Sequence, residues 1–322
     1  MRMLLVAGTI ATLSWFCAPA HAQSYPVKPV RYVVPFAAGD SPDIVARLVA
    51  DRLSRMWDQQ VVVENRVGAG GTIGAAFVAK APADGHTLLQ CNIASSAIAL
   101  AIYPKLPYDA LRDFAMVSRI ASTANVLFVH PSMPARSVAE LVAYAKANPG
   151  KLSHGSSGVG TSPHLSMELF KLIAGIDMVH IAYKGASPAL ADLMGGQIPV
   201  MMANLPATLQ HILSGKVRAL AVSSAKRAVQ LPSVPTMIES GVPDYVVTAW
   251  YGLCAPAGTP QPILEKLHTD LTKTLQAADV RQRLTDLTID VAPTSRDEFT
   301  AFIRSELERW AKVVKDAGVP SQ

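Results

Sequence analysis

The sequence predicts an α/β fold made of two sheets joined by crossing strands. Short apolar runs rich in valine, isoleucine and tyrosine alternate with amphipathic helical patterns, as is typical of α/β proteins. The 322 residues are enough for two domains, and 50% of them are hydrophobic. The sequence has neither repeats at solenoid periods nor low-complexity linkers. The prediction of the fold class therefore rests on the alternation of strand and helix patterns.

Short apolar runs bounded by turn residues are predicted as strands. They are 30–36, 60–65, 87–91, 115–120, 125–131, 178–183, 198–203, 217–224 and 246–256. The run 125–131, with the loop 131–137 after it, is the candidate crossing into the second sheet. A return crossing is expected within 220–250.

Apolar residues that recur at the helical period predict the helices. They are 43–56, 137–147, 163–174, 188–194, 206–214, 262–276 and 296–317. Ser137 is the expected N-cap of the second helix, with Glu140 at the capping-box position. Gly318, with Pro320 beyond it, marks the expected end of the last helix.

The N-terminal segment predicts secretion. Arg2 precedes an apolar stretch over 3–18, and Ala20-His21-Ala22 is an A-x-A cleavage site. Residues 1–22 are therefore expected to be a signal peptide cleaved after Ala22. The alternatives are an uncleaved membrane anchor, for which the stretch is short, and lipidation at Cys17, which a preceding Phe disfavours.

Charge and cysteine content limit the partners. Without Arg2, the mature chain has 28 basic and 24 acidic residues, a net charge of +4 with no basic tract. Nucleic-acid binding is not expected, because it requires a concentrated basic face. Cys91 and Cys254 lie in apolar runs far apart in the sequence, and they are either bridged by a disulfide or buried as free thiols.

Four loops rich in glycine, serine and proline each lie before a helical pattern. They are 35–43, 67–76, 155–165 and 184–190. In open α/β sheets, ligands bind where strands end and helices begin, because the first helical turns carry unpaired N–H groups. Small residues let a ligand approach the backbone, so the loops predict either one binding site for a small carboxylate or plain connections.

Motifs for catalysis are incomplete. The serine-hydrolase pattern fails because Val159 follows Gly155-Ser156-Ser157-Gly158, and the dinucleotide pattern fails at Ile73. The glycine loop has no lysine for a P-loop, and His154 and His164 lack metal-ligand spacing. The sequence therefore predicts no enzyme activity, cofactor or metal site. Asp43 is expected to be structural, whereas Asp40 could reach a ligand, and His164 either faces a ligand or caps a helix.

Several long segments carry a resemblance to a known family. They are PFAAGDSPDIVARLVADRL, VVVENRVGAGGTIGA, APADGHTLL, SSGVGTSPHLSMELFK, VHIAYKGASPALADLMGGQIPVMM, VRALAVSSAKRAVQLPSVPTMIESG and WYGLCAPAGTP. From about residue 25 onward, the chain resembles the tripartite tricarboxylate transporter substrate receptors, the periplasmic Bug/TctC-type solute-binding proteins.

The resemblance implies a two-lobed periplasmic-binding-protein fold of type II, a Venus flytrap in which each lobe is a mixed sheet flanked by helices. The expected lobes are 23–124 with 226–322, and 125–225. The family implies a monomeric, non-catalytic receptor in the periplasm that captures a small carboxylate for inner-membrane permease subunits.

The resemblance also implies ligand-binding residues. They are Phe36, Ala38, Gly39, Ala69, Gly70, Gly71, Ser157, Thr161, His164, Tyr183, Lys184, Gly185 and Pro188, to which Asp40 and Asn204 are added as candidates at the cleft.

Two departures from the family pattern bear on the ligand. Asp40 stands where the family usually has the second glycine of its first loop, and Ala203 stands where an acidic residue is usual. A carboxylate in the cleft would repel an acidic ligand, so Asp40 is hypothesised to meet an amino or amide group of the ligand. The alternatives for function are a secreted hydrolase or isomerase on a similar scaffold, and a sensory receptor for a signalling partner.

Overall fold

The computed structural model describes residues 25–321. The predicted signal peptide and its cleavage after Ala22 lie outside the described residues. Within this described range, no helix is both long and apolar enough to span a bilayer.

Strands and helices alternate as the sequence pattern predicts. The strands are β1 (Val30–Val34), β2 (Val61–Asn65), β3 (Thr87–Asn92), β4 (Phe114–Val129), β5 (Ser153–Ser156), β6 (Val179–Ala182), β7 (Val200–Asn204), β8 (Arg218–Val222), β9 (Thr248–Pro256) and β10 (Ile289–Val291). The helices are α1 (Ser41–Trp57), η1 (Ala69–Gly71), α2 (Thr72–Ala79), η2 (Ala94–Ile98), α3 (Ala99–Ile102), α4 (Val138–Ala147), α5 (Ser162–Ala174), α6 (Ala186–Met194), α7 (Leu205–Leu213), α8 (Gln261–Gln276), α9 (Ala278–Asp286) and α10 (Arg296–Asp316).

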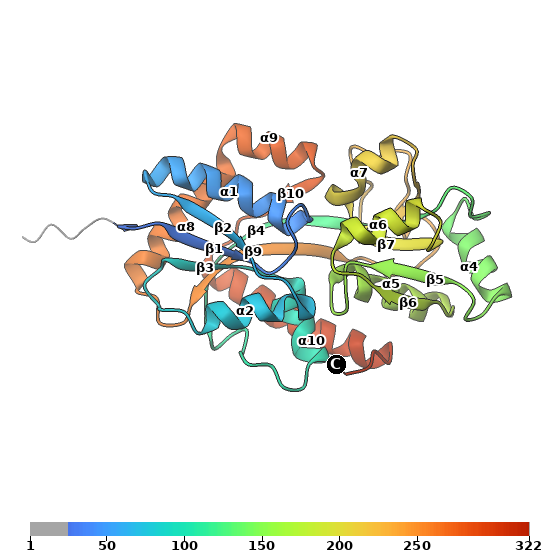
Figure 1. The fold of residues 1–322 in the computed structure, drawn as a ribbon, viewed down its shortest axis with the longest axis horizontal. Helices are drawn as coiled ribbons and strands as arrows, with labels where there is room; N and C mark the ends of the chain where they lie inside the picture. Colours follow the sequence, from blue (N-terminus) through green and yellow to red (C-terminus); the bar gives the residue numbers. More distant parts are fainter. Residues whose placement is uncertain (1–24, 322) are drawn as a thin grey trace, which may run out of the picture.

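The long strand β4 belongs to both sheets. Its first part, up to Ala124, pairs with β9 and β10 in the first sheet, which continues through β3 and β1 to β2. From Asn125 onward it pairs with β7 and β8 in the second sheet, which continues to β5 and β6. Figure 1 shows the two halves side by side, with β4 and β9 running between them. The chain therefore crosses between the sheets within β4, at Ala124 and Asn125, and the loop 131–137 follows the crossing.

Helices cover both faces of each sheet. On the first sheet, α1, α8 and α9 lie on one face, while α2 and α10 lie on the other (Figure 1). In the second half, α6 and α7 lie on one side, with α4 and α5 on the other. Leu53, Leu271, Phe299 and Trp310 are fully buried in the larger core, and α10 contacts α5 in addition to its own half.

A disulfide joins two strands of the first sheet. Cys91 in β3 and Cys254 in β9 are bonded, with their Cα atoms 6.0 Å apart. The two residues lie 163 positions apart in the sequence, so the bond closes a loop that contains the whole second sheet. Of the two states that the sequence left open, the structure shows the bridged one.

The structure differs from the predicted elements where side chains are small or polar. β5 was not predicted, because Ser153-His154-Gly155-Ser156 has no apolar side chain, and its second half was assigned to the loop 155–165. The runs 115–120 and 125–131 form one strand, since the small residues between them pair with β9 and β10. Helices 72–79, 94–102 and 278–286 and strand 289–291 were not among the predicted elements.

Candidate functional site

The four glycine- and serine-rich loops line one cavity. β1 is parallel to β2, and β5 is parallel to β6, so the loops that follow these strands leave the same edge of each sheet. Residues of all four loops surround a cavity of about 570 Å³ between the two sheets. The hypothesis of a shared site is therefore supported over that of unrelated connections.

The first loop is held in shape by Asp43. Its carboxylate accepts hydrogen bonds from the backbone N–H of Gly39 (2.9 Å), from Arg47 (2.8 Å) and from the side chain of Asn65 (2.8 Å). Asn65 also donates to the carbonyl oxygen of Phe36 at 2.9 Å. Burial acts to raise the pKa of Asp43, but these charge-assisted bonds together outweigh it and lower that pKa. Asp43 thus has the structural role expected from the sequence.

The second loop brings its backbone close to the opposite half. Gly70 has a φ of 62°, and a Cβ atom at this position would lie 3.0 Å from the carbonyl oxygen of Val159. Gly71 has a φ of 94°, and its Cβ would lie 3.2 Å from Pro35. Both positions therefore require glycine for conformation and for space.

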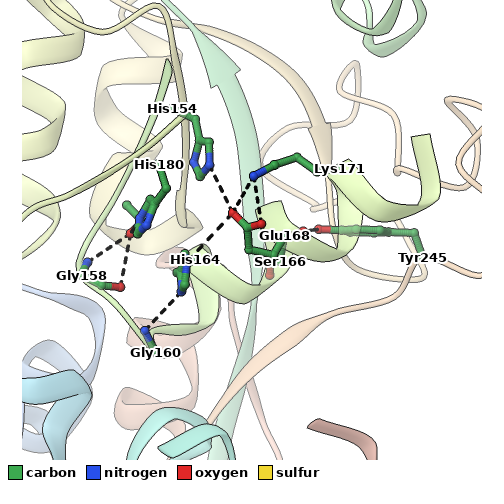
Figure 2. Close-up of polar contacts among 10 residues, drawn as sticks. His154, Gly158, Gly160, His164, Ser166, Glu168, Lys171, His180 and Tyr245 are labelled. Carbon is green, nitrogen blue, oxygen red and sulfur yellow. Dashed lines mark hydrogen bonds and ion pairs between the residues drawn. The ribbon is translucent and has the colours of Figure 1, made fainter. Parts of the chain in front are cut away.

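The third loop rests on a buried polar cluster. The Oγ of Thr161 donates to the carbonyl oxygen of Gly158 at 2.7 Å, and the backbone N–H of Gly160 donates to Nδ1 of His164 at 3.2 Å. The ring of His164 stacks on that of His180 with centroids 4.0 Å apart. Figure 2 shows this histidine turned toward the buried cluster beneath the loop.

The cluster keeps its histidines neutral. His154, His164 and His180 form a stack, with Glu168 and Lys171 beside it (Figure 2). Burial lowers the pKa of His164 to about 4 and that of His180 to about 3, and it also lowers the pKa of His154. An imidazole that accepts from a backbone N–H at Nδ1 must be unprotonated there, which agrees with this direction.

A smaller chamber lies next to the main cavity, further inside the molecule. Its volume of about 20 Å³ is comparable to the space that one water molecule needs. Asp40, Ser41, Asn204 and Tyr251 line this chamber. Ser41 Oγ and Tyr251 OH are buried and neighbour each other, but neither makes a hydrogen bond of normal geometry within the described residues. The chamber is therefore a polar end of the cleft with unused hydrogen-bonding capacity.

Asp40 connects the two halves across the cleft. Its side chain is 5% exposed, and Oδ1 accepts a hydrogen bond from the backbone N–H of Ala186 at 3.1 Å, in the first turn of α6. Burial, opposed by the N–H of Ala186 and assisted by the nearby Asp43, raises the pKa of Asp40 to about 6. Within residues 25–321, Asp40 is thus an ionisable group in the cleft to which no Lys, Arg or His side chain is paired.

Most of the predicted site residues lie at these two cavities. Those that line one or both are Phe36, Asp40, Ala69, Gly70, Gly71, Ser157, Thr161, Tyr183, Lys184, Gly185 and Asn204. Ala38, Gly39 and Pro188 are exposed and do not line either cavity. His164 does not line them either, because its ring lies in the buried cluster below the third loop.

Sequence reasoning missed other residues at the cleft. Tyr103 lines the main cavity, and Ser41 and Tyr251 line the inner chamber. Tyr251 lies in a strand whose apolar pattern indicated only core, so nothing in the pattern separated it from its neighbours.

Asn204 lies at the chamber as expected, and its amide nitrogen donates to Asn125 Oδ1 at 2.6 Å. Ala203, at the second departure, is fully buried in the smaller core.

Two α/β halves with a polar cavity between them, lined by helix-starting loops, define the class of two-lobed solute-binding proteins. The comparisons specify the family. Residues 45–319 match the model described as "Tripartite tricarboxylate transporter family receptor". The chain belongs to this family, whose receptors are periplasmic solute-binding proteins.

Similar proteins agree with this assignment. Protein BugT of Bordetella pertussis is 38% identical over 318 residues, which cover 98% of each chain. The structure "R. palustris Rpa4515 with adipate" has a TM-score of 0.90 and 38% identity, covering 92% of this chain and 100% of that one. MatC (Rpa3494) from Rhodopseudomonas palustris with bound malate has a TM-score of 0.85 and 34% identity, covering 90% and 100%.

Proposed function

We propose that this protein is a periplasmic receptor that captures a small carboxylate-bearing solute in the cleft. The observation that carries this function is the convergence of four helix-starting loops, two from each sheet, on one cavity. Such loops offer backbone N–H groups and hydroxyls to a carboxylate. Two similar proteins have structures with adipate and with malate, which supports the same ligand class here.

The ligand is enclosed by closure of two lobes. The proposed lobes are 23–124 with 226–322, and 125–225, which meet within β4. The ligand contacts come from the cavity-lining residues of the four loops, and His164 supports the third loop from below. Closure excludes water, so the donors must compensate for desolvation of the carboxylate.

The closed form delivers its ligand to the inner-membrane subunits of a tripartite tricarboxylate-type transporter. In this proposal the receptor is a monomer and has no catalytic activity. A hydrolase would turn over the acids that it binds, so incubation of bound acids with the protein, followed by product analysis, separates the two functions.

A thermal-shift screen against small carboxylates tests the proposed function. A ligand at a hundredfold excess over its Kd stabilises the folded state by about 2.7 kcal/mol, which is readily measured. If no small carboxylate raises the melting temperature, the proposed function is wrong.

Gly70→Ala tests the place of binding, and Gly175→Ala is its matched control. Both glycines are left-handed, with φ values of 62° and 59°, but a Cβ at Gly175 would meet nothing within 4 Å. We expect both variants to lose about 1 kcal/mol of stability from backbone strain. Only Gly70→Ala should also weaken binding, because its methyl group meets the backbone of Val159 across the cleft. Equal affinities for the two variants would place the ligand elsewhere.

A further inference from the structure

The cleft carries one acidic and one basic side chain. Among the described residues that line the two cavities, Asp40 and Lys184 are the charged ones. Lys184 lines the main cavity but not the inner chamber, whereas Asp40 lies where the two meet and lines both.

Few hydrogen-bond donors reach the carboxylate of Asp40. In the described part of the chain, the backbone N–H of Ala186 is the donor that reaches its carboxylate. No Lys, Arg or His side chain lines the inner chamber within the described residues. A buried carboxylate ordinarily takes several hydrogen bonds or an ion pair, so this one has capacity for a donor from a ligand.

The other polar groups of the inner chamber also offer oxygen acceptors to a hydrogen-bond donor of a ligand. Ser41 and Tyr251 are 1% and 2% exposed and line the chamber. Their hydroxyls lie near each other, but neither makes a hydrogen bond of normal geometry within the described residues. The amide nitrogen of Asn204 is already bonded to Asn125 and Ser162, which leaves its carbonyl oxygen as an acceptor. A second carboxylate placed here would face Asp40 at close range in a buried setting, which is unfavourable.

This inference rests on the proposed function. We propose that the inner chamber receives a cationic or amide hydrogen-bond donor of the ligand. The carboxylate of the same molecule lies in the main cavity, which Lys184 lines. The ligand is thus an acid with an amino group at its other end, and Asp40 is the residue that selects it over a dicarboxylate.

Calorimetric titration of a matched set of acids tests this selection. At pH 8, 6-aminohexanoate, hexanoate and adipate share six carbons and one carboxylate, and differ only at the far end. The set of 4-aminobutyrate, butyrate and succinate repeats the comparison with four carbons. We expect the amino acid of at least one set to bind roughly tenfold more tightly than its partners, or about 1.4 kcal/mol.

Asp40→Asn and Asp40→Gly should abolish this preference, and the dicarboxylate should gain affinity in both. Asp40 has a φ of −70°, so either replacement fits the backbone. Asp177→Asn is the charge-matched control, because Asp177 is exposed and precedes β6, at the end of that strand opposite the cleft. It should keep the preference of the parent.

Two results would overturn the inference: a dicarboxylate that binds the parent as tightly as the amino acid, or a ranking that is unchanged in both Asp40 variants. If none of the six acids binds the parent or the variants while another small carboxylate raises the melting temperature, the proposed function stands and this inference fails; if no small carboxylate does so, both fail.

Discussion

Replacement of Asp40 by asparagine should stabilise the unliganded protein at neutral and alkaline pH. Burial raises the pKa of this carboxyl from 3.8 to about 6, so the folded state binds the proton more tightly than the unfolded state does. The carboxyl therefore contributes stability below pH 3.8 that is lost as the pH rises through about 6. Asparagine keeps an acceptor for the N–H of Ala186 but carries no charge.

The size of the effect follows from the pKa shift. A shift of about two units corresponds to about 3 kcal/mol at about 1.4 kcal/mol per unit. The free energy of unfolding of Asp40→Asn should exceed that of the parent by about 3 kcal/mol at pH 8, and the difference should approach zero below pH 4. Urea denaturation at pH 4, 6 and 8, followed by tryptophan fluorescence, measures this difference.

Asp43→Asn is the control with the opposite sign. Its carboxylate is well paired, and these bonds lower its pKa, so the charge stabilises the fold at neutral pH. This variant should be less stable than the parent at pH 8, and the deficit should shrink as the pH falls below 4. A stability difference between Asp40→Asn and the parent that does not change with pH would refute the reasoning.

Three further predictions concern the scaffold. Replacing Cys91 and Cys254 by alanine should destabilise the protein by up to about 5 kcal/mol, because the bond closes a loop of 163 positions; urea midpoints of parent and variant measure this loss. His180→Gln should make stability less sensitive to acid between pH 6.5 and about 3, where the parent loses stability because its unfolded imidazole binds a proton that the folded one rejects; melting curves across this range compare the two. Glu306→Ala should cost about 2–4 kcal/mol, since it leaves two buried tryptophan N–H groups unpaired, and a ligand titration should show unchanged affinity.

The sequence predicted the alternation of strands and helices better than the residues at which each element begins and ends. Amphipathic helices such as α1 and α10 have apolar faces that match their buried residues, so their periodicity was sufficient. β5 was missed because its side chains are small and polar, and only its neighbours β6 and β7 specify it as a strand. The pairing of distant strands decides such segments, and local propensity does not contain that information.

The site was predictable where glycine and hydroxyl residues mark a helix start. Gly70 and Thr161 belong to such loops, and both lie at the cleft. Tyr251 was not predictable, because a tyrosine in an apolar strand has the same local pattern whether it faces a core or a chamber. His164 lies in the right loop but turns toward its own half, and the stack that it forms with His180 joins residues 16 positions apart on different elements. Side-chain direction at a helix start depends on what packs beneath it.

The chain order of the two sheets has a consequence for synthesis. Every partner that β4 has in the second sheet lies between residues 153 and 222, whereas the first sheet needs β9 and β10 from beyond residue 247. As the chain is synthesised from its N-terminus, the second sheet can be completed while β3 still lacks its neighbour β9. The unpaired edge of β3 is therefore the part of the N-terminal third that needs protection by chaperones longest, and the C-terminal quarter completes the first sheet last.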